Sequence, residues 1–368
     1  MIDPYKLSRA EHNRVYAEIE ASHLLKSSAQ ERPHAIITGG QPGAGKSRIT
    51  SNAKAELAQR GGAVLIDADK LRRYHRDYDS LLKADDTQAA NRTHADAGAW
   101  AAELLRAGAA GQRNLIVDQT SKDPAALDNL AQRLHEKGYT VELRAMAVNE
   151  RISEQRIHMR YETQKAVVGF GRFSTKDNHD HAYKMIPESV GFVEKNRSVD
   201  AIKLYDKDHQ TVYSNRLENG EWVEPAKARE ALETERSRPM SLNEKREYAT
   251  GYEALARMVA APDRQATAEQ INAIDHLRKQ ANCELAAAIF KQVPPDEAIK
   301  QRPELAPAYA AMAAIDKRAE ADGMTAAQRD HVAAQSRNSI AKSIERGDTL
   351  EVRINESVIA MRQQDTER

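Results

Sequence analysis

The residues best suited to chemistry form a glycine-rich run with the spacing of a phosphate-binding loop. The run reads Gly40-Gln41-Pro42-Gly43-Ala44-Gly45-Lys46-Ser47. It matches the Walker A pattern of Gly, four residues, then Gly-Lys-Ser. Glycines let successive backbone N–H groups turn inward around a polyphosphate. Lys46 is then expected to reach the β- and γ-phosphates, and Ser47 to bind Mg²⁺. The alternative is a plain glycine-rich turn before a helix.

The segments on either side of this run have the character that a phosphate loop needs. Residues 34–38 (HAIIT) form a short apolar strand, and residues 46–59 have helical spacing with no breaker. A helix that begins at the lysine adds the positive end of its dipole to the phosphate site. The sequence therefore predicts a nucleotide cofactor, expected to be ATP, together with Mg²⁺. The loop alone does not choose among kinase, GTPase and motor.

Two carboxylates at the end of the next predicted strand favour a kinase. Asp67 and Asp69 follow the apolar run 63–66, and the carboxyl ends of parallel strands are where an α/β sheet places its site. A kinase needs a carboxylate there to accept the proton of a substrate hydroxyl. Asp69 is the expected base. Asp67 either lines the substrate site or caps the following helix, since aspartate is also a preferred N-cap residue.

Arginines that could stabilise the transferring phosphate come from two places. Arg160 lies in a predicted helix, and Arg172 lies in the glycine-containing stretch Gly169-Phe170-Gly171-Arg172-Phe173, a setting typical of a lid. Each alone is also compatible with a solvated surface position. Guanine-reading Asn-Lys-x-Asp is not found after a suitable strand. The run NLIVD is followed by Gln119 and not by the Glu of many motor ATPases.

The elements that must position these residues alternate between strand and helix. We predict strands at 34–38, 63–67, 114–118 and 140–148, helices at 46–59, 95–109, 123–137 and 150–163, and a hairpin from 201–205 and 210–214. This alternation predicts an α/β P-loop fold with a central, mostly parallel sheet flanked by helices. We place this domain at residues 1–235 and expect 240–368, which is rich in Ala, Glu, Arg and Gln, to be a helical accessory region.

Composition limits the partners and the compartment. Lysine plus arginine and aspartate plus glutamate each number 55 in 368 residues, so the balanced charge makes nucleic acid an unlikely main partner. The single cysteine, Cys283, excludes an internal disulfide and fits a reducing cytoplasm. Neither a signal-peptide core nor an apolar run of about 18 residues is present. We expect a cytoplasmic protein without a membrane span.

These motifs, in this order, resemble the zeta toxin family over roughly residues 30–215. The segments that carry the resemblance are ITGGQPGAGKS, VLIDADKLR, NLIVDQT, MAVNERISEQRIHMRYE and AIKLYDKDHQTVYS. The resemblance implies a toxin kinase that phosphorylates the 3′-hydroxyl of UDP-N-acetylglucosamine and blocks peptidoglycan precursor synthesis. It also implies a small helical antitoxin that covers the ATP cleft.

Carried over by position, the resemblance gives roles to residues at several strand ends. Lys46 and Ser47 match the nucleotide and Mg²⁺ residues, Asp69 the base, and Arg160 and Arg172 the phosphate-stabilising pair. Further matches are expected in the acceptor site, where the resemblance implies that Asp118 and Thr120 hold the sugar nucleotide. Lys122 stands where the family has an arginine. His75 and Asp96 are candidates to face the acceptor. Asp118 is alternatively an acid that supports Mg²⁺, His75 a packing residue, and Asp96 a surface residue.

Departures from the family pattern leave other functions open. The family commonly has Gly between the acid and the threonine, where this chain has Gln119, and Lys122 cannot grip a phosphate bidentately as arginine does. The acceptor is alternatively NAD, a nucleoside, an antibiotic or a nucleic acid 5′ end. A different class altogether is a non-enzymatic, nucleotide-dependent interaction protein of a mobile element, in which the C-terminal helices are the working part.

Overall fold

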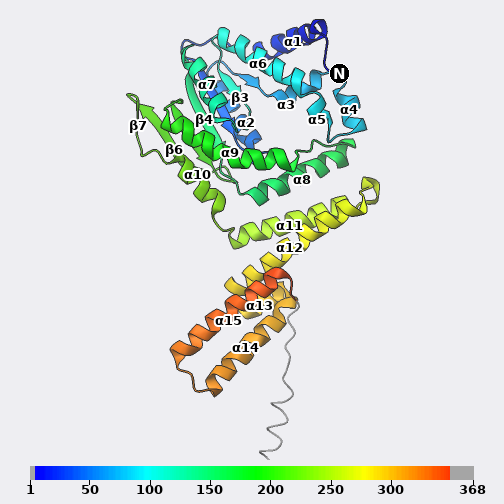
Figure 1. Cartoon of the computed structure of the whole chain (residues 1–368), viewed down its shortest axis with the longest axis vertical. Helices are drawn as coiled ribbons and strands as arrows, with labels where there is room; N and C mark the ends of the chain where they lie inside the picture. The colour runs from blue at the N-terminus through cyan, green and yellow to red at the C-terminus, as the bar shows by residue number, and fades with distance from the viewer. Residues whose placement is uncertain (1–4, 349–368) are drawn as a thin grey trace, which may run out of the picture. The chain divides into compact units, whose positions relative to one another are not determined.

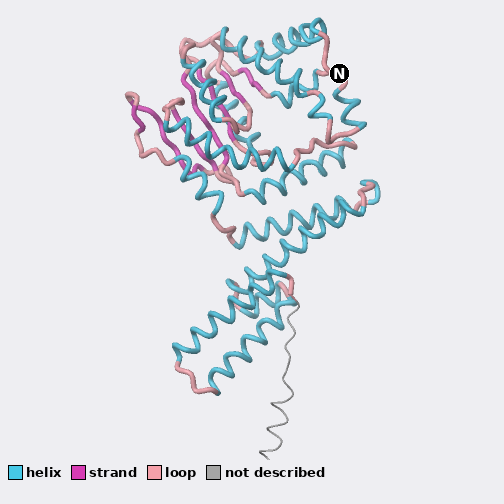
Figure 2. Tube along the Cα trace, viewed as in Figure 1, coloured by secondary structure: helices cyan, strands magenta, loops and turns pink. Residues whose placement is uncertain are grey.

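The structure is a computed structural model that describes residues 5–348 of the chain. The chain divides into two compact units, Met1–Pro239 and Met240–Arg368. All strands of the described residues lie in the first unit, and the second is built from helices (Figure 2). The last part of the predicted helical region, residues 349–368, lies outside the described residues. No helix within residues 5–348 is both long enough and apolar enough to cross a membrane.

A seven-stranded sheet forms the centre of the first unit (Figure 1). Its strands are β1 His34–Gly39, β2 Val64–Ile66, β3 Leu115–Val117, β4 Thr140–Met146, β5 Ala201–Tyr205, β6 Thr211–Glu218 and β7 Glu221–Trp222. The strand order is β2-β3-β1-β4-β5-β6-β7. The first five strands run parallel and β6 and β7 add an antiparallel edge. The predicted α/β fold with a mostly parallel sheet is therefore confirmed.

Helices cover both faces of this sheet, because successive side chains of a strand point to opposite faces. Ala35 and Ile37 of β1 belong to the large core beneath α6, α7, α9 and α10, whereas Ile36 packs with Ala53 and Leu57 of α2. The helices of this unit are α1 Arg9–Leu24, α2 Lys46–Ala58, α3 Ala68–Leu71, α4 Tyr78–Ala84, α5 Ala89–Arg92, α6 His94–Ala110, α7 Pro124–His135, α8 Glu150–Val168, α9 Lys176–Lys195 and α10 Ala228–Ser237.

The sequence prediction missed the short helices α4 and α5 and the longer helices α9 and α10. Helix α9 contains Pro187, a residue that normally interrupts a helix, and α10 lies where the apolar pattern thins out before the second unit. Both are held by tertiary packing: Val190 and Val193 of α9 and Leu232 of α10 are fully or almost fully buried. Helix α8 also extends to Val168, five residues beyond the predicted end, where Gly169 in the left-handed conformation terminates it.

The second unit is a set of helices with its own apolar interior. Its helices are α11 Leu242–Val259, α12 Ala268–Gln292, α13 Pro295–Gln301, α14 Ala306–Ala321 and α15 Ala326–Arg346. Phe290 of α12 is fully buried, and its ring lies 4.9 Å from that of Tyr309 in α14. Capping boxes begin α11, α12 and α15, which satisfies backbone donors that the first turn of a helix leaves free.

Candidate active site

The glycine-rich run forms a tight turn between β1 and α2. Gly43 and Gly45 both have positive φ, 78° and 98°, a conformation that glycine adopts without a steric cost. Gly45 is the N-cap of α2, and no side chain caps this helix end. A Cβ on Gly43 would lie 2.0 Å from the backbone oxygen of Ser153. The first amides of α2 therefore remain available to an anion.

Lys46 closes this turn with its own amine. Its Nζ donates to the backbone oxygen of Gly40 at 2.6 Å and of Gln41 at 3.3 Å. Burial lowers the pKa of Lys46 to about 8, although the Asp118 and Asp69 carboxylates raise it. Arg172 and Arg160 add to the lowering. The buried amine thus lies near two carboxylates and two arginines, and an incoming polyphosphate would favour its charged form.

Asp118 lies directly after β3 and turns toward the phosphate-loop helix. Its two carboxylate oxygens accept hydrogen bonds from Thr38 at 3.3 Å and from Thr50 of α2 at 2.9 Å. Ser47, the predicted Mg²⁺ residue, stands in the first turn of the same helix. Hydroxyl and carboxylate oxygens are the ligands that Mg²⁺ prefers, so these residues fit a nucleotide-bound Mg²⁺. This position favours the alternative in which Asp118 supports the metal.

Asp69 lies in the first turn of α3 and forms ion pairs with two arginines. Arg172 Nη1 is 2.8 Å from its Oδ2, and Arg72 Nε is 3.1 Å from its Oδ1. Burial raises the pKa of the Asp69 carboxyl, but Arg172 and Arg72 outweigh it, so that this pKa lies below its ordinary value. The side chain is still 44% exposed, which leaves the carboxylate accessible to an acceptor.

Asp67 has a different environment from Asp69, although only one residue separates them. Its carboxylate accepts the backbone N–H of Lys70 at 3.2 Å and pairs with the Lys70 amine at 3.0 Å. It is the N-cap of α3, which corresponds to the capping alternative. The substrate-binding alternative for Asp67 stays a prediction.

The two predicted arginines come together although they flank the end of α8. Arg160 Nη2 donates to the backbone oxygen of Arg172 at 3.4 Å. Burial, with a smaller contribution from the neighbouring Arg172, lowers the pKa of Arg160 to about 10. The Nε atom of Arg160 is buried and has no hydrogen-bond partner among the described residues. A buried guanidinium donor without a partner beside a second arginine suits an anionic ligand such as a phosphate.

Thr120 and Lys122 follow Asp118 on the loop that leaves β3. The backbone oxygen of Thr120 accepts the N–H of Gly40 at 3.1 Å, which fixes this loop to the start of the phosphate loop. Lys122 Nζ donates to Asn178 Oδ1 of α9 at 2.9 Å. Both residues therefore border the phosphate-loop side of the sheet, and their contact with an acceptor stays a prediction.

His75 and Asp96 are placed in the interior, so the expectation that they face an acceptor is corrected. His75 is 3% exposed, and its Nε2 lies 3.0 Å from the backbone oxygen of Tyr5. Asp96 is 5% exposed and accepts the N–H of Leu7 at 3.2 Å, with His12 Nδ1 at 3.3 Å. Both side chains tie the N-terminal segment to the α6 region, which satisfies their polar atoms internally. The alternative of a surface role for Asp96 is wrong for the same reason.

Three residues near the site were missed by sequence reasoning. Arg72 was overlooked although its spacing of three from Asp69 in a helix allows an ion pair. Arg156 and His209 lie beside Gly45: a Cβ on that glycine would be 3.6 Å from Arg156 Nη1 and 3.5 Å from the His209 ring. No local signal connects the last two with the loop, because they come from α8 and from the turn between β5 and β6.

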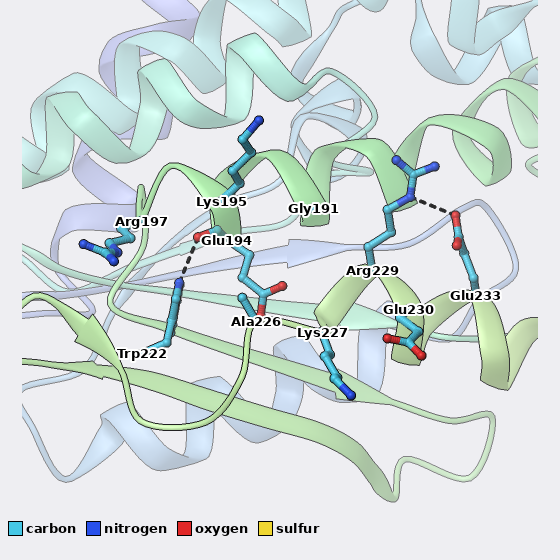
Figure 3. A pocket seen from close by; sticks show the side chains of 10 residues that line it. All are labelled: Gly191, Glu194, Lys195, Arg197, Trp222, Ala226, Lys227, Arg229, Glu230 and Glu233. Carbon is cyan, nitrogen blue, oxygen red and sulfur yellow. Dashed lines mark hydrogen bonds and ion pairs between the residues drawn. The ribbon is translucent and has the colours of Figure 1, made fainter.

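A pocket of about 560 Å³ lies elsewhere in the first unit, over the end of α9, β7 and the start of α10 (Figure 3). Its wall includes Trp222, whose indole N–H donates to the backbone oxygen of Glu194 at 2.8 Å. Arg229 in the same wall is paired with Glu233 and Glu188. None of the predicted site residues lines this pocket, so we assign it no part in the chemistry.

Comparisons with known proteins find related sequences over most of the first unit. The family model described as Zeta toxin matches residues 20–218, more than half of the chain. Toxin PezT of Streptococcus pneumoniae serotype 4 is 29% identical over 213 residues, which cover 55% of this chain and 83% of that protein. Toxin zeta of Enterococcus hirae is 28% identical over 214 residues, or 58% of this chain and 72% of that protein.

A solved structure supports the same fold. It comes from work on the PezAT chromosomal toxin–antitoxin system of Streptococcus pneumoniae. The likeness has a TM-score of 0.60 at 23% sequence identity and covers 70% of this chain and all of that one.

Proposed function

The chain belongs to the zeta toxin family and is a P-loop kinase, and from this premise we propose that it phosphorylates UDP-N-acetylglucosamine. The transferred group is the γ-phosphate of ATP, and the acceptor is the 3′-hydroxyl of the sugar. This acceptor is the one that the resemblance to the family implies. Its phosphorylation withdraws a precursor from cell-wall synthesis, which accounts for toxicity.

The observation that carries the proposal is the gathering of Asp69, Arg172 and Arg160 beside Lys46. The Asp69–Arg172 pair measures 2.8 Å, and Arg160 reaches the Arg172 backbone at 3.4 Å. Three cations and one accessible carboxylate are the groups that phosphoryl transfer needs, because the reaction depends on positioning and charge stabilisation more than on covalent chemistry.

The proposed step is an in-line displacement. The acceptor oxygen forms a bond to the γ-phosphorus while the bond to the β–γ bridging oxygen breaks and ADP leaves. Asp69 takes the proton of the hydroxyl, and its low pKa keeps the carboxylate ionised before the step. Lys46, Arg160 and Arg172 stabilise the charge on the transferring group.

Magnesium binding and acceptor positioning fall to residues around β3. Ser47 and Asp118 are the proposed ligands or supports of Mg²⁺, which neutralises charge on the β- and γ-phosphate oxygens when it is bound. Thr120 and Lys122 are proposed to orient the acceptor, and Asp67 caps the N-terminus of α3. The departure at Lys122 favours one second candidate, a kinase of the same mechanism with another acceptor.

A partner protein belongs to the same proposal. A helical antitoxin is expected to cover the ATP cleft, as the family resemblance implies, and the related fold was studied in a toxin–antitoxin system. A protein that neutralises the toxin in this way has to compete with ATP. Displacement of a fluorescent ATP analogue by the neutralising protein tests this directly, and simultaneous binding of both would exclude a cover over the cleft.

One reaction panel tests the proposed acceptor. Purified full-length protein is incubated with ATP, Mg²⁺ and one acceptor at a time: UDP-N-acetylglucosamine, NAD, a nucleoside, chloramphenicol or a 5′-hydroxyl oligonucleotide. Mass spectrometry then looks for the mass of one added phosphate. We expect it on the sugar nucleotide with wild type and not with Lys46→Ala. Phosphate on another acceptor alone assigns the second candidate, and transfer by Lys46→Ala contradicts the site itself.

A further inference from the structure

A buried arginine contacts the phosphate loop from a helix beyond the family-matched region. Arg236 lies in α10, whereas the family model ends at residue 218. Its Nη2 donates to Gln41 Oε1 at 2.8 Å. Gln41 is the second residue of the phosphate-loop motif, and it is fully buried. A segment that the family model does not include therefore reaches the centre of the nucleotide-binding motif.

Gln41 is fixed from both ends of its side-chain amide. Besides accepting from Arg236, its Nε2 donates to the backbone oxygen of Val148 at 2.9 Å and to Ser153 Oγ at 3.1 Å. The backbone oxygen of Ser153 also packs against Gly43, which leaves no room for a side chain there. The phosphate loop is thus contacted by the start of α8 and by α10. A buried amide held this completely has one orientation.

Arg236 is itself placed with little freedom. It is 3% exposed, its Nη1 donates to the backbone oxygen of Tyr183 at 2.7 Å, and its guanidinium stacks 4.4 Å from the centre of the Tyr183 ring. The backbone oxygen of Arg236 accepts from Asn149, the N-cap of α8, at 3.0 Å. A stacked guanidinium with fixed donors loses little further freedom when it binds an acceptor. The helices that it joins, α8, α9 and α10, are neighbours in Figure 1.

We propose that Arg236 is a positioning residue of the phosphate loop, acting through Gln41 to hold the amides of residues 40–45 in the orientation that binds a nucleoside triphosphate. The inference rests on the proposed kinase site. It adds that the nucleotide-binding unit extends through α10 and does not end with the hairpin β5–β6. The guanidinium is suited to this role because a buried acceptor left without its donor is costly.

The test uses the full-length protein and an ATP analogue that cannot be hydrolysed, AMP-PNP with Mg²⁺, so that it does not depend on the acceptor. Isothermal titration calorimetry gives both the Kd and the number of sites. Arg236→Met keeps the length of the stem over Tyr183 but removes every donor. We expect its Kd to rise about tenfold or more with about one site per chain. A purely structural role lowers the number of sites and leaves the Kd of the remaining sites unchanged.

Matched variants complete the experiment. Arg229→Met, in the first part of the same helix (Figure 3) and with a side chain that is 47% exposed, is expected to bind as wild type does. Gln41→Met removes the other end of the bond, and the double variant is expected to lose no more than the larger single loss. If Arg236→Met does not fold, Arg236→Lys and Gln41→Met carry the same comparison. If wild type binds AMP-PNP and these variants bind it with the same Kd, the inference about Arg236 is wrong and the proposed function is unaffected. If wild type does not bind AMP-PNP with Mg²⁺, the proposed kinase function is wrong.

Discussion

Arg172 Nη1 lies 2.8 Å from Asp69 Oδ2. The acid comes from the first turn of α3 and the arginine from the loop between α8 and α9, so the pair joins the two sides of the candidate site. In the free protein the arginine neutralises the carboxylate. We expect a bound triphosphate to draw this guanidinium toward the transferring group, which would leave the carboxylate to accept a proton.

Replacing Asp69 with asparagine is expected to remove transfer and spare nucleotide binding. The amide has the shape of the carboxylate but cannot take a proton, and a positioned base contributes about 10²–10⁴-fold to a rate. A steady-state assay of ADP release with acceptor present measures the loss in kcat. Asp79→Asn, an exposed acid in the nearby α4, is the control and should be unaffected. A wild-type rate in Asp69→Asn would show that the base is another residue.

Activity is expected to fall on the alkaline side through the titration of Lys46. Its pKa of about 8 in the free protein means that the amine is charged below that pH and neutral above it. Only the charged form attracts phosphate, so kcat/KM for ATP should decline as the pH rises through about 8, since this ratio reports the free enzyme. Lys46→Arg stays protonated and should lose this limb. A wild-type profile that stays flat to pH 10 contradicts the assignment.

Truncation of Arg172 is expected to slow the reaction and to raise the pKa of Asp69. The arginine lowers that pKa in the wild type, so the acidic limb of the pH profile should move to higher pH in Arg172→Ala. Arginines over a transferring phosphate are worth about 10³-fold or more in kcat. Arg172→Lys should recover part of the lost kcat, because lysine keeps the positive charge. The recovery should be incomplete, because lysine is a point charge and lacks the forked donors of arginine. Arg216→Ala, an exposed arginine paired with Glu218, is the control, and an equal loss there would point to a nonspecific effect of charge.

Two glycines with nearly the same φ should respond very differently to alanine. Gly43 and Gly138 have φ of 78° and 81°, so both substitutions incur the left-handed strain of about 1–2 kcal/mol. The new Cβ at Gly43 meets the Ser153 oxygen at 2.0 Å, whereas nothing lies within 4 Å at Gly138. We expect Gly43→Ala to abolish nucleotide binding or folding, and Gly138→Ala to show only the strain in urea unfolding. Similar stability and binding in the two variants would mean that the loop can shift away from α8.

The sequence by itself determined the phosphate loop and the elements on either side of it. Gly40 to Ser47 are consecutive, and the geometry that they require is local: a strand, a turn with positive φ, and the first turn of a helix. Asp69 was a candidate for a similar reason, because it lies three residues after the short strand β2, Val64–Ile66. The fold class follows from the alternation of such segments, and here the structure agrees.

Only the tertiary structure decided which groups surround these residues. His75 and Asp96 have polar side chains at plausible positions in the sequence, yet packing against the N-terminal segment buries both of them. The bond from Arg236 to Gln41 spans 195 residues of chain, and nothing in the local pattern of either residue predicts the other. A contact between distant segments depends on how helices pack across the sheet, which is a property of the folded chain as a whole.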